Sequence, residues 1–459
     1  MGLKRTHRCR VWRTYKGVTH LRKPLIAPLI LLLILPLTWV GGGQQTIEGA
    51  SARRQTYEFA NGRWFDGQKF VARKFYTVGG LLTSKKPARV DSVIDLAGKF
   101  IVPPFGEAHN HNVDWSDAEQ WARVKRMYLE GGVFYVKNPA NLPRARMPLL
   151  AGLINVPTSI DAVFANGVLT ATDGHPLDLV RRNIARGGML ESDLDGGFCW
   201  IINNVADLDS KWEGIKAGKP DFIKTMLIYS EEYAKRKDDK KYFSWKGLDP
   251  TLLPDIVRRA HRAGLPVTAH VESATDFHNA LIAGVDEINH TPGFRPEYND
   301  FANYKDLSRY EITGADARLA ARRRVVVVTT LGTTINWALD DKQKSPETRV
   351  RVRDLLVRNL RLLKKHGVRI AVGSDSFRQT SVPEALSLSR LRAFDSLTLL
   401  KMWCETTAAA IFPARKISHL KDGYEASFLA LSADPLQDFT NVQKIELRVK
   451  QGEILSLEK

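Results

Sequence analysis

The stretch LLPDIVRRAHRAGLPVTAHV, residues 252–271, shows the pattern that decides the fold. A helical segment comes first, Gly264 can end it in the left-handed conformation, and a short run rich in apolar residues follows. The same unit recurs at residues 277–290 and 355–375, with an earlier copy at 127–136. Alternating helices and apolar strands are typical of a parallel sheet that helices cover on its outside.

The number of such strands predicts how the sheet is arranged. Eight are expected, near residues 101–107, 133–137, 163–169, 221–227, 266–271, 286–290, 325–331 and 369–374. We therefore predict an α/β fold whose centre is a (β/α)8 TIM-type barrel over residues 101–412. In such a barrel the chemistry lies at the C-terminal ends of the strands.

The segments on either side of this region have a different pattern. Residues 55–100 contain short aromatic and β-branched runs separated by Asn-Gly and Gly-Gly, which is typical of hairpins. Residues 413–459 return to β-type runs. We predict that these two terminal segments pair into one small β-sandwich beside the barrel.

The first 43 residues have the pattern of an export signal. Eight Lys or Arg and no acidic residue occupy residues 1–23, and an apolar run at 25–40 and three glycines follow. An uncleaved membrane anchor is the alternative, although the run is shorter than the roughly 20 residues that a spanning helix needs. We expect a linker at 44–54 and a periplasmic or secreted protein, or, with an anchor, one on the inner membrane facing the periplasm.

The net charge of +18 does not indicate a nucleic-acid partner, because the leader carries eight of the positive charges. The other basic residues are dispersed on expected helix faces, as in residues 352–367, which is typical of solvated helix surface. Outside the leader only Cys199 and Cys404 remain, so we expect two buried free thiols and no disulfide framework.

Metal-competent side chains lie in or directly after the expected strands. They are His109, His111, Lys224, His270, His290 and Asp375. Residues i and i+2 of a strand point to the same face, so His109 and His111 are expected to project together while Asn110 faces away. Because strand ends converge in a closed barrel, this set supplies enough ligands for two divalent metal ions, as in a metal-dependent hydrolase.

Lys224 is an unusual member of this set, since an ordinary lysine has a pKa of about 10.4 and is a cation at neutral pH. Its apolar neighbours in the strand, such as Ile223, would desolvate the amine and favour its neutral form. A neutral amine can take up carbon dioxide, and the resulting carbamate is an anionic ligand that can bridge two metals. A lysine paired with an acidic neighbour is the alternative, and Lys137 in the second strand is a second candidate.

In their order along the chain, these residues resemble the amidohydrolase superfamily, in its binuclear subgroup with a carboxylated lysine on strand 4. The resemblance rests on VIDLAGKFIVPPFGEAHNH, DFIKTML, AHVES, AGVDEINH and GSDS, and on residues 404–431, where the chain leaves the barrel. It implies that His109, His111 and Asp375 hold one metal, that His270 and His290 hold the second, and that carboxylated Lys224 bridges them. It also implies a metal-bridging hydroxide whose proton Asp375 accepts and passes to the leaving group.

Two further residues are candidates for contact with the substrate: His175 after the third strand and Tyr229 after the fourth. Glu272 follows His270 by two residues, whereas deaminases of the family typically carry a glutamate three residues after that histidine. The remaining histidines of the barrel and tail are expected to be surface or packing residues: His261, His278, His366 and His419.

The resemblance implies an exported amidohydrolase that cleaves the C–N bond of an amide, peptide-like or cyclic amide substrate with two divalent ions, expected to be zinc. Three alternatives stay open: a mononuclear deaminase, a hydrolase of lactones or phosphoesters, and a catalytically silent binding relative. The expected partner is a small-molecule substrate, and a homo-oligomer is left open. The loops after the strands, at 230–250 and 291–312, are expected to decide which substrate binds.

Overall fold

The computed structural model describes residues 54–113, 118–142, 152–294, 307–341 and 345–457. The predicted leader over residues 1–43 lies outside these ranges, as does nearly all of the predicted linker, so both stay predictions. In the ranges that the structure describes, no helix is long and apolar enough to cross a membrane.

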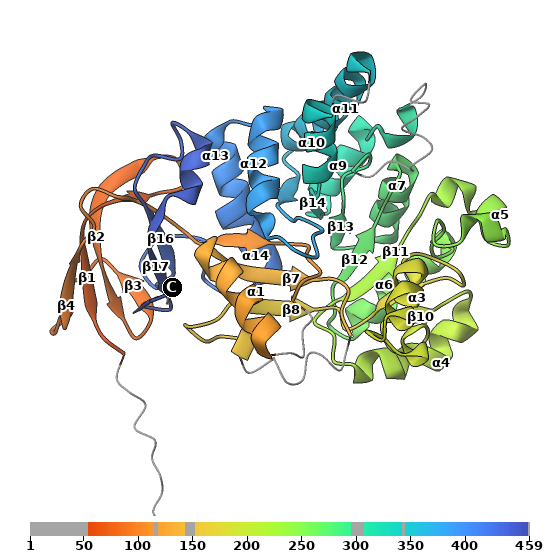
Figure 1. Cartoon of the computed structure of the whole chain (residues 1–459), viewed down its shortest axis with the longest axis horizontal. Coiled ribbons are helices and arrows are strands. Elements are labelled where there is room, and N and C mark those ends of the chain that lie inside the picture. The colour runs from red at the N-terminus through yellow and green to blue at the C-terminus, as the bar shows by residue number, and fades with distance from the viewer. Residues whose placement is uncertain (1–53, 114–117, 143–151, 295–306, 342–344, 458–459) are drawn as a thin grey trace, which may run out of the picture. The chain divides into compact units, whose positions relative to one another are not determined.

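Two groups of parallel strands form the α/β part of the chain (Figure 1). A three-stranded sheet has the order β6 (Phe105–Glu107), β7 (Val133–Asn138), β8 (Asp161–Phe164). A seven-stranded sheet has the order β10 (Cys199–Ile201), β9 (Val168–Thr170), β11 (Ile223–Met226), β12 (Val267–His270), β13 (Glu287–Asn289), β14 (Val326–Val328), β15 (Arg369–Ala371). Each predicted strand region contains a strand, but the one strand predicted near 163–169 is two strands, β8 and β9, in different sheets, and β10 was not predicted.

Backbone hydrogen bonds connect these two sheets. After β6 and β15, the Ala108 amide donates to the Val372 carbonyl at 2.9 Å, and the Ser374 amide donates to the His109 carbonyl at 3.1 Å. The three-stranded sheet ends with β8, and the next strand along the chain, β9, belongs to the seven-stranded sheet. The mixed α/β class is therefore confirmed. The strand ladders themselves do not join into one sheet within the described residues, so the closed barrel stays a prediction.

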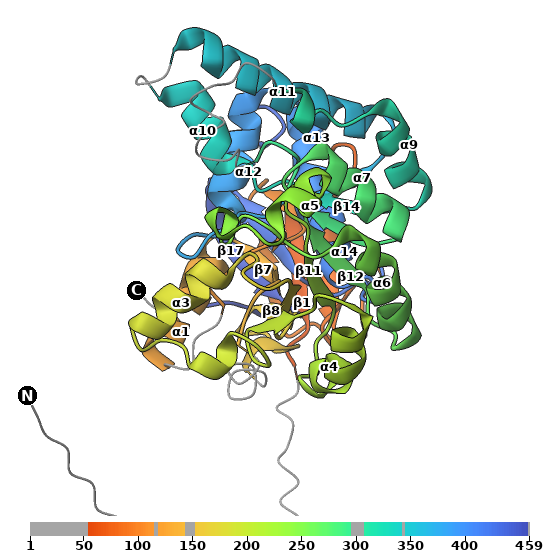
Figure 2. The ribbon, with the colours of Figure 1, turned by 90° about the vertical axis from the view of Figure 1, so that its right-hand side faces the viewer.

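Helices surround the parallel strands, as the two views of Figures 1 and 2 show. Their bounds are α1 (Ala118–Glu130), α3 (Leu177–Ala185), α4 (Val205–Ala217), α5 (Tyr233–Arg236), α6 (Leu253–Arg262), α7 (Ala274–Ala283), α9 (Gly314–Arg322), α10 (Gly332–Asp340), α11 (Pro346–Lys365), α12 (Ser381–Leu391), α13 (Ser396–Lys401) and α14 (Thr407–Ile411).

The helix α6 shows why these segments take this form. Its buried residues Leu253, Ile256, Val257 and Ala260 are three or four positions apart, so they line one face of the helix. Gly264 follows with φ of +73°, a left-handed conformation that costs glycine nothing, and it turns the chain into β12. The predicted helix, glycine and strand unit is confirmed here.

Both terminal segments contribute to one further sheet of eight strands. Its order is β18 (Glu453–Ile454), β17 (Ile445–Lys450), β16 (Phe428–Leu431), β5 (Phe100–Val102), β1 (Tyr57–Phe65), β2 (Phe70–Val78), β3 (Leu81–Thr83), with β4 (Ser92–Asp95) paired to β1. The two segments meet where β16 pairs with β5 in antiparallel orientation. This joining confirms part of the prediction, while the two layers of a sandwich stay a prediction.

A buried ion cluster fastens this sheet to the parallel strands. Asp161, at the start of β8, is fully buried, and its two carboxylate oxygens lie 2.9 Å from the Lys450 amine and 2.8 Å from the Arg415 guanidinium. Lys450 ends β17 and is itself fully buried. A buried charge is stable only when it is paired, so this cluster fixes where β17 meets β8.

Candidate active site

All six predicted metal ligands line one cavity of about 750 Å³. Five of them follow or end a strand and Lys224 lies within one: His109 and His111 follow β6, Lys224 is on β11, His270 ends β12, His290 follows β13 and Asp375 follows β15. The structure therefore brings together side chains that lie far apart in the sequence, at the C-terminal ends of the strands where the chemistry was expected.

One set of donor atoms consists of His109, His111 and Asp375. The two imidazole Nε2 atoms are 3.2 Å apart, and the Asp375 carboxylate lies 3.3 Å from the first and 2.9 Å from the second. An ion about 2.0–2.1 Å from its nitrogen ligands separates the corners of a tetrahedral site by roughly 3.3 Å. The three atoms thus fit a common metal ion. Asn110 faces away, as predicted, and donates to the Gln379 carbonyl at 2.7 Å.

A second pair of donors adjoins this set. His270 Nδ1 and His290 Nε2 are 2.8 Å apart, and the His290 ring lies 4.7 Å from the His109 ring. His109, His290 and Asp375 each offer one ligand atom within 4.8 Å of the others. Donors this close together fit two neighbouring ions.

Lys224 has the buried environment that the sequence predicts. Its side chain is almost wholly buried, and burial lowers its pKa to about 7 although Asp375 and Glu287 act in the opposite direction. The amine donates a hydrogen bond to Asn289. At this pKa about half of the amines are neutral at pH 7, which is the form that reacts with carbon dioxide.

Two of the other predicted ligands have protonation states that suit a metal. Burial lowers the pKa of His109 to about 3, so its imidazole is neutral at pH 7. Burial alone would raise the pKa of Asp375, but hydrogen bonds with His109 and His111 hold it well below its ordinary value. Neutral imidazoles and an ionised carboxylate are the forms that bind metal ions.

Residues 244–455 match the model of the amidohydrolase family. The matched part, which is just under half of the chain, belongs to this family. The match, together with the convergent donor atoms, identifies an enzyme of the hydrolase class and implies a TIM-barrel-like domain. A comparison of the sequence with curated proteins gives no match.

Solved structures of similar fold agree with this family. The A. niger ochratoxinase has 18% sequence identity and a TM-score of 0.65, over 88% of this chain and 96% of that chain. A prolidase complexed with N-methylphosphonate-L-proline has 17% identity and a TM-score of 0.64, over 88% of this chain and all of that chain. Molinate hydrolase has 16% identity and a TM-score of 0.65, over 88% and 95%. At these identities the likeness concerns the fold.

Two residues were predicted to contact the substrate, and one of them, His175, lines the cavity. Its ring lies 5.1 Å from the His270 ring. Glu272 is buried beside the same histidine, with its carboxylate 3.2 Å from His270 Nε2. His175 is therefore positioned to meet a substrate, whereas Glu272 is positioned to orient His270.

Tyr229 does not line the cavity. Its ring is fully buried, with the Arg236 and Arg309 guanidinium groups 4.4 Å and 4.5 Å from its centre, and its hydroxyl lies 3.2 Å from the Tyr310 hydroxyl. The reason lies in the backbone, because Tyr229 has φ of +48° and the chain turns there. The position of Tyr229 does not support the predicted contact with the substrate.

The two buried lysines have different surroundings. Lys137 lies 2.8 Å from the Glu287 carboxylate and 3.0 Å from the Thr268 hydroxyl, and its ammonium sits 4.1 Å from the centre of the Phe222 ring. It is not among the residues that line the cavity. The alternative of a lysine paired with an acid therefore describes Lys137, not Lys224.

Two residues that support the ligands were not predicted. Glu107 is fully buried and accepts hydrogen bonds from the backbone amides of His109 and Ser374, and burial raises its pKa to about 8. Thr330 lies 2.6 Å from Nδ1 of His290. Such contacts fix the orientation of a ligand. The only signal in the sequence is that Glu107 stands in an apolar run just before the two histidines.

Several side chains predicted to lie outside the site do so. Three of the four surface or packing histidines pair with carboxylates, at 2.9, 2.7 and 3.6 Å: His261 with Asp286, His278 with Asp316 and His419 with Glu405. Neither these nor His366 lines the cavity. Cys199 and Cys404 are buried and free, as predicted.

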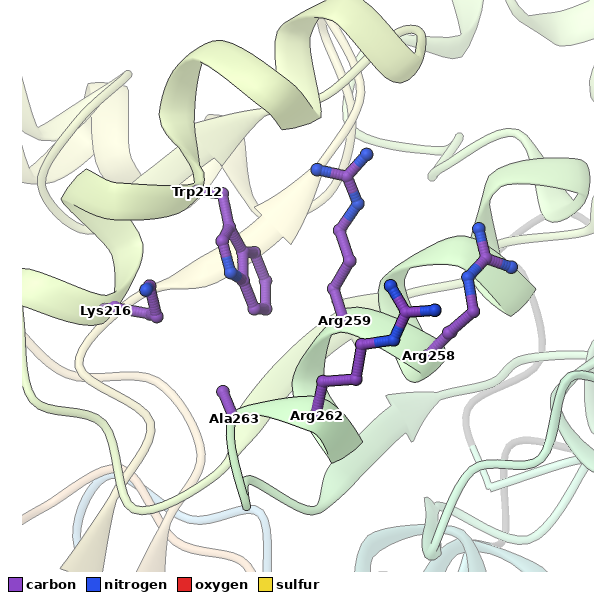
Figure 3. Close-up of a pocket in the computed structure, with 6 residues that line it drawn as sticks. All are labelled: Trp212, Lys216, Arg258, Arg259, Arg262 and Ala263. Carbon is purple, nitrogen blue, oxygen red and sulfur yellow. The ribbon is translucent and has the colours of Figure 1, made fainter.

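A separate hollow of about 360 Å³ lies between α4 and α6. It is lined by Trp212, Lys216, Arg258, Arg259, Arg262 and Ala263 (Figure 3). Most of its positive charges have carboxylate partners, since Asp255 pairs with Arg258 and Arg259, and Glu213 pairs with Lys216. This hollow contains none of the predicted ligands, and its ion pairs fit the prediction of solvated helix surface.

Proposed function

We propose that this amidohydrolase is a binuclear, metal-dependent enzyme that hydrolyses the C–N bond of a small amide-type substrate. The observation that carries the proposal is the arrangement of two adjoining donor sets in one cavity that Lys224 also lines. The similar structures support the choice of bond, since they include an ochratoxinase, a prolidase and molinate hydrolase.

The donor atoms divide between the two ions. His109, His111 and Asp375 would hold one ion, His270 and His290 would hold the other, and Lys224 would bridge them as a carbamate. Bound divalent ions polarise a carbonyl oxygen and lower the pKa of water. The closed eight-stranded barrel is part of this proposal, because it is the arrangement that lets strands from β6 to β15 present their ends to one cavity.

The chain's own groups supply the proton transfers and the binding surface. The Asp375 carboxylate is ionised and faces the cavity, so it can accept a proton from the attacking water and deliver it to the leaving amine. His175 lies on the side of His270 and can donate a hydrogen bond to the substrate carbonyl. Apolar walls from Leu142, Phe198 and Phe243 limit the access of water.

The test combines elemental analysis with a hydrolysis screen of the zinc-loaded protein. We expect two ions per chain and turnover of dipeptides, N-acyl amino acids or cyclic amides. Asp375→Asn should abolish this turnover, while His366→Gln, a histidine outside the cavity, should leave it unchanged. One ion per chain with release of ammonia would instead indicate a mononuclear deaminase. Hydrolysis of lactones or phosphoesters alone would indicate a lactone or phosphoester hydrolase. Binding of these compounds without turnover would indicate a catalytically silent relative.

We also propose that the enzyme acts outside the cytoplasm, since residues 1–43 have the pattern of an export signal. A chain with a C-terminal epitope tag should be recovered from the periplasm or the medium, shortened by cleavage near Gly41–Gly43. Recovery of the uncut chain with the membrane would support the anchored form. Recovery of the uncut chain in the cytoplasm would contradict export.

A further inference from the structure

We propose that Arg378 and Arg123 form an anion-binding subsite at the rim of the catalytic cavity, so that the preferred substrate is an amide with an apolar body and a carboxylate. This inference rests on the proposed function and specifies its substrate class. It assigns a role to two arginines that the metal chemistry does not use.

The position of Arg378 is the first argument. A second hollow of about 250 Å³ is lined by Asn112, Gln120, Arg123, Val124, Met127, Phe377 and Arg378. Phe377 and Arg378 line this hollow and the catalytic cavity as well. A ligand that extends from the metal site past Phe377 therefore meets the Arg378 guanidinium first and then Arg123.

The lack of a carboxylate partner is the second argument. In the part of the chain that the structure describes, no carboxylate lies within 4.0 Å of either Arg378 or Arg123, and both are exposed. Arg182, the other arginine of the catalytic cavity, differs because it pairs with Asp178 at 2.9 Å. Guanidinium groups bind carboxylates through two parallel hydrogen bonds, so an unpaired pair of arginines at a cavity rim favours an anionic ligand.

Phe377 provides the third argument. It is a large apolar side chain with 52% of its surface exposed, and its ring stacks on the ligand His111 with ring centres 5.0 Å apart. A substrate that covered this ring would remove apolar surface from water, which favours binding. The cavity has further apolar lining, with Met189, Phe198 and Trp245 among it. An apolar body between the metals and the arginines fits these surroundings.

The length of chain between the groups sets a scale for the substrate. Arg378 follows Asp375 by three residues, so at most about 10 Å of extended backbone separates their Cα atoms. An N-acyl amino acid with an apolar side chain has its carboxylate within such a distance of the scissile bond. The subsite therefore favours substrates of this chemical class.

The experiment compares a matched pair of substrates, an N-acyl amino acid and its neutral carboxamide, in zinc-loaded full-length protein. For Arg378→Gln we expect KM for the carboxylate to rise roughly tenfold or more, with kcat and KM for the carboxamide unchanged. Arg123→Gln should show the same selectivity with a smaller effect. Lys125→Gln is the control, because it removes a cation from α1 that does not line the hollow.

A further variant makes the result decisive. Arg378→Glu should lower turnover of the carboxylate substrate and increase that of an amide with an amine in the same place. Equal changes for the carboxylate and the carboxamide, or no change in any arginine variant, would overturn the subsite while turnover still supports the proposed function. If no amide is hydrolysed, calorimetric binding of the carboxylate and carboxamide to wild type and Arg378→Gln decides the subsite separately, and equal affinities would overturn it.

Discussion

At the scale of single residues, two buried lysines differ in their surroundings, and the difference supports the proposed ligand role of Lys224 over Lys137. Lys224 lines the cavity and has a pKa lowered by burial to about 7, while Lys137 pairs with Glu287 and is not among the lining residues. We expect Lys224→Ala to bind fewer than two metals and to lose at least about a hundredfold in kcat, since charge stabilisation of this kind contributes several kcal/mol. Elemental analysis and turnover measure both.

Lys137→Met is the matched control for this prediction. It removes a buried lysine of the neighbouring three-stranded sheet, so it should lower thermal stability because Glu287 is left without its cation, yet it should keep both metals. Two metals and full activity in the Lys224→Ala variant would exclude the bridging role.

The same residue predicts a pH dependence of stability in the metal-free protein. Unfolding returns the Lys224 pKa from about 7 to its ordinary value of 10.5, so the unfolded chain binds more protons between these values. The free energy of unfolding therefore rises with pH over this interval, by at most about 1.4 kcal/mol per pH unit. Below pH 7 the folded protein bears the full cost of burying the protonated amine. Thermal unfolding at pH 7, 8 and 9, with chelator present, should show this rise in wild type relative to Lys224→Met. Parallel curves for the two proteins would contradict it.

The sequence predicted which side chains line the cavity, because strand ends are visible in it. It did not predict contacts where the direction of a side chain depends on the backbone or on distant residues. Tyr229 follows its strand as the ligands do, but its left-handed conformation turns its ring into a stack with Arg236. Thr330 supports His290 from another strand end, which no local pattern reveals. Glu107 was missed because a single acid in an apolar run has no periodicity.

At the scale of elements, the sequence predicted the repeated helix, glycine and strand units because their periodicity is local. The link between the terminal sheet and β8 depends instead on the buried Asp161, with Lys450 and Arg415, which come from distant parts of the chain. Their spacing in the sequence carries no signal for this contact. The boundaries between the barrel and the terminal segments stay predictions for the same reason.

Breaking the cluster of Asp161, Lys450 and Arg415 is expected to lower stability and to leave activity unchanged. Asp161→Asn leaves the fully buried Lys450 without its carboxylate, while the partly buried Arg415 keeps Glu425, so we expect a loss of about 3–5 kcal/mol in the free energy of unfolding. Asp340→Asn is the control, since its exposed pair with Arg390 should contribute less than about 1 kcal/mol. Urea denaturation measures both, and turnover per folded molecule should be unchanged. Equal, small losses would show that the cluster does not hold the sheet in place.

At the scale of the whole molecule, the donor atoms come from strands that run from β6 to β15, so a bound metal ion would link almost the entire parallel part of the chain. An unfolded chain cannot keep these donors together. Metal binding must therefore stabilise the folded state as a whole, and free ion at a hundred times its Kd would add about 2.7 kcal/mol per site.

This linkage predicts a rise in Tm when zinc is returned to chelated protein. The rise should come in two steps, as the first and second equivalents bind, because the two donor sets adjoin but use different histidines. His111→Ala, which removes a donor from the first set only, should keep one of the steps. A single step in the wild type that ends at one equivalent would argue for one ion, and an unchanged Tm would show that the convergent donors do not bind metal.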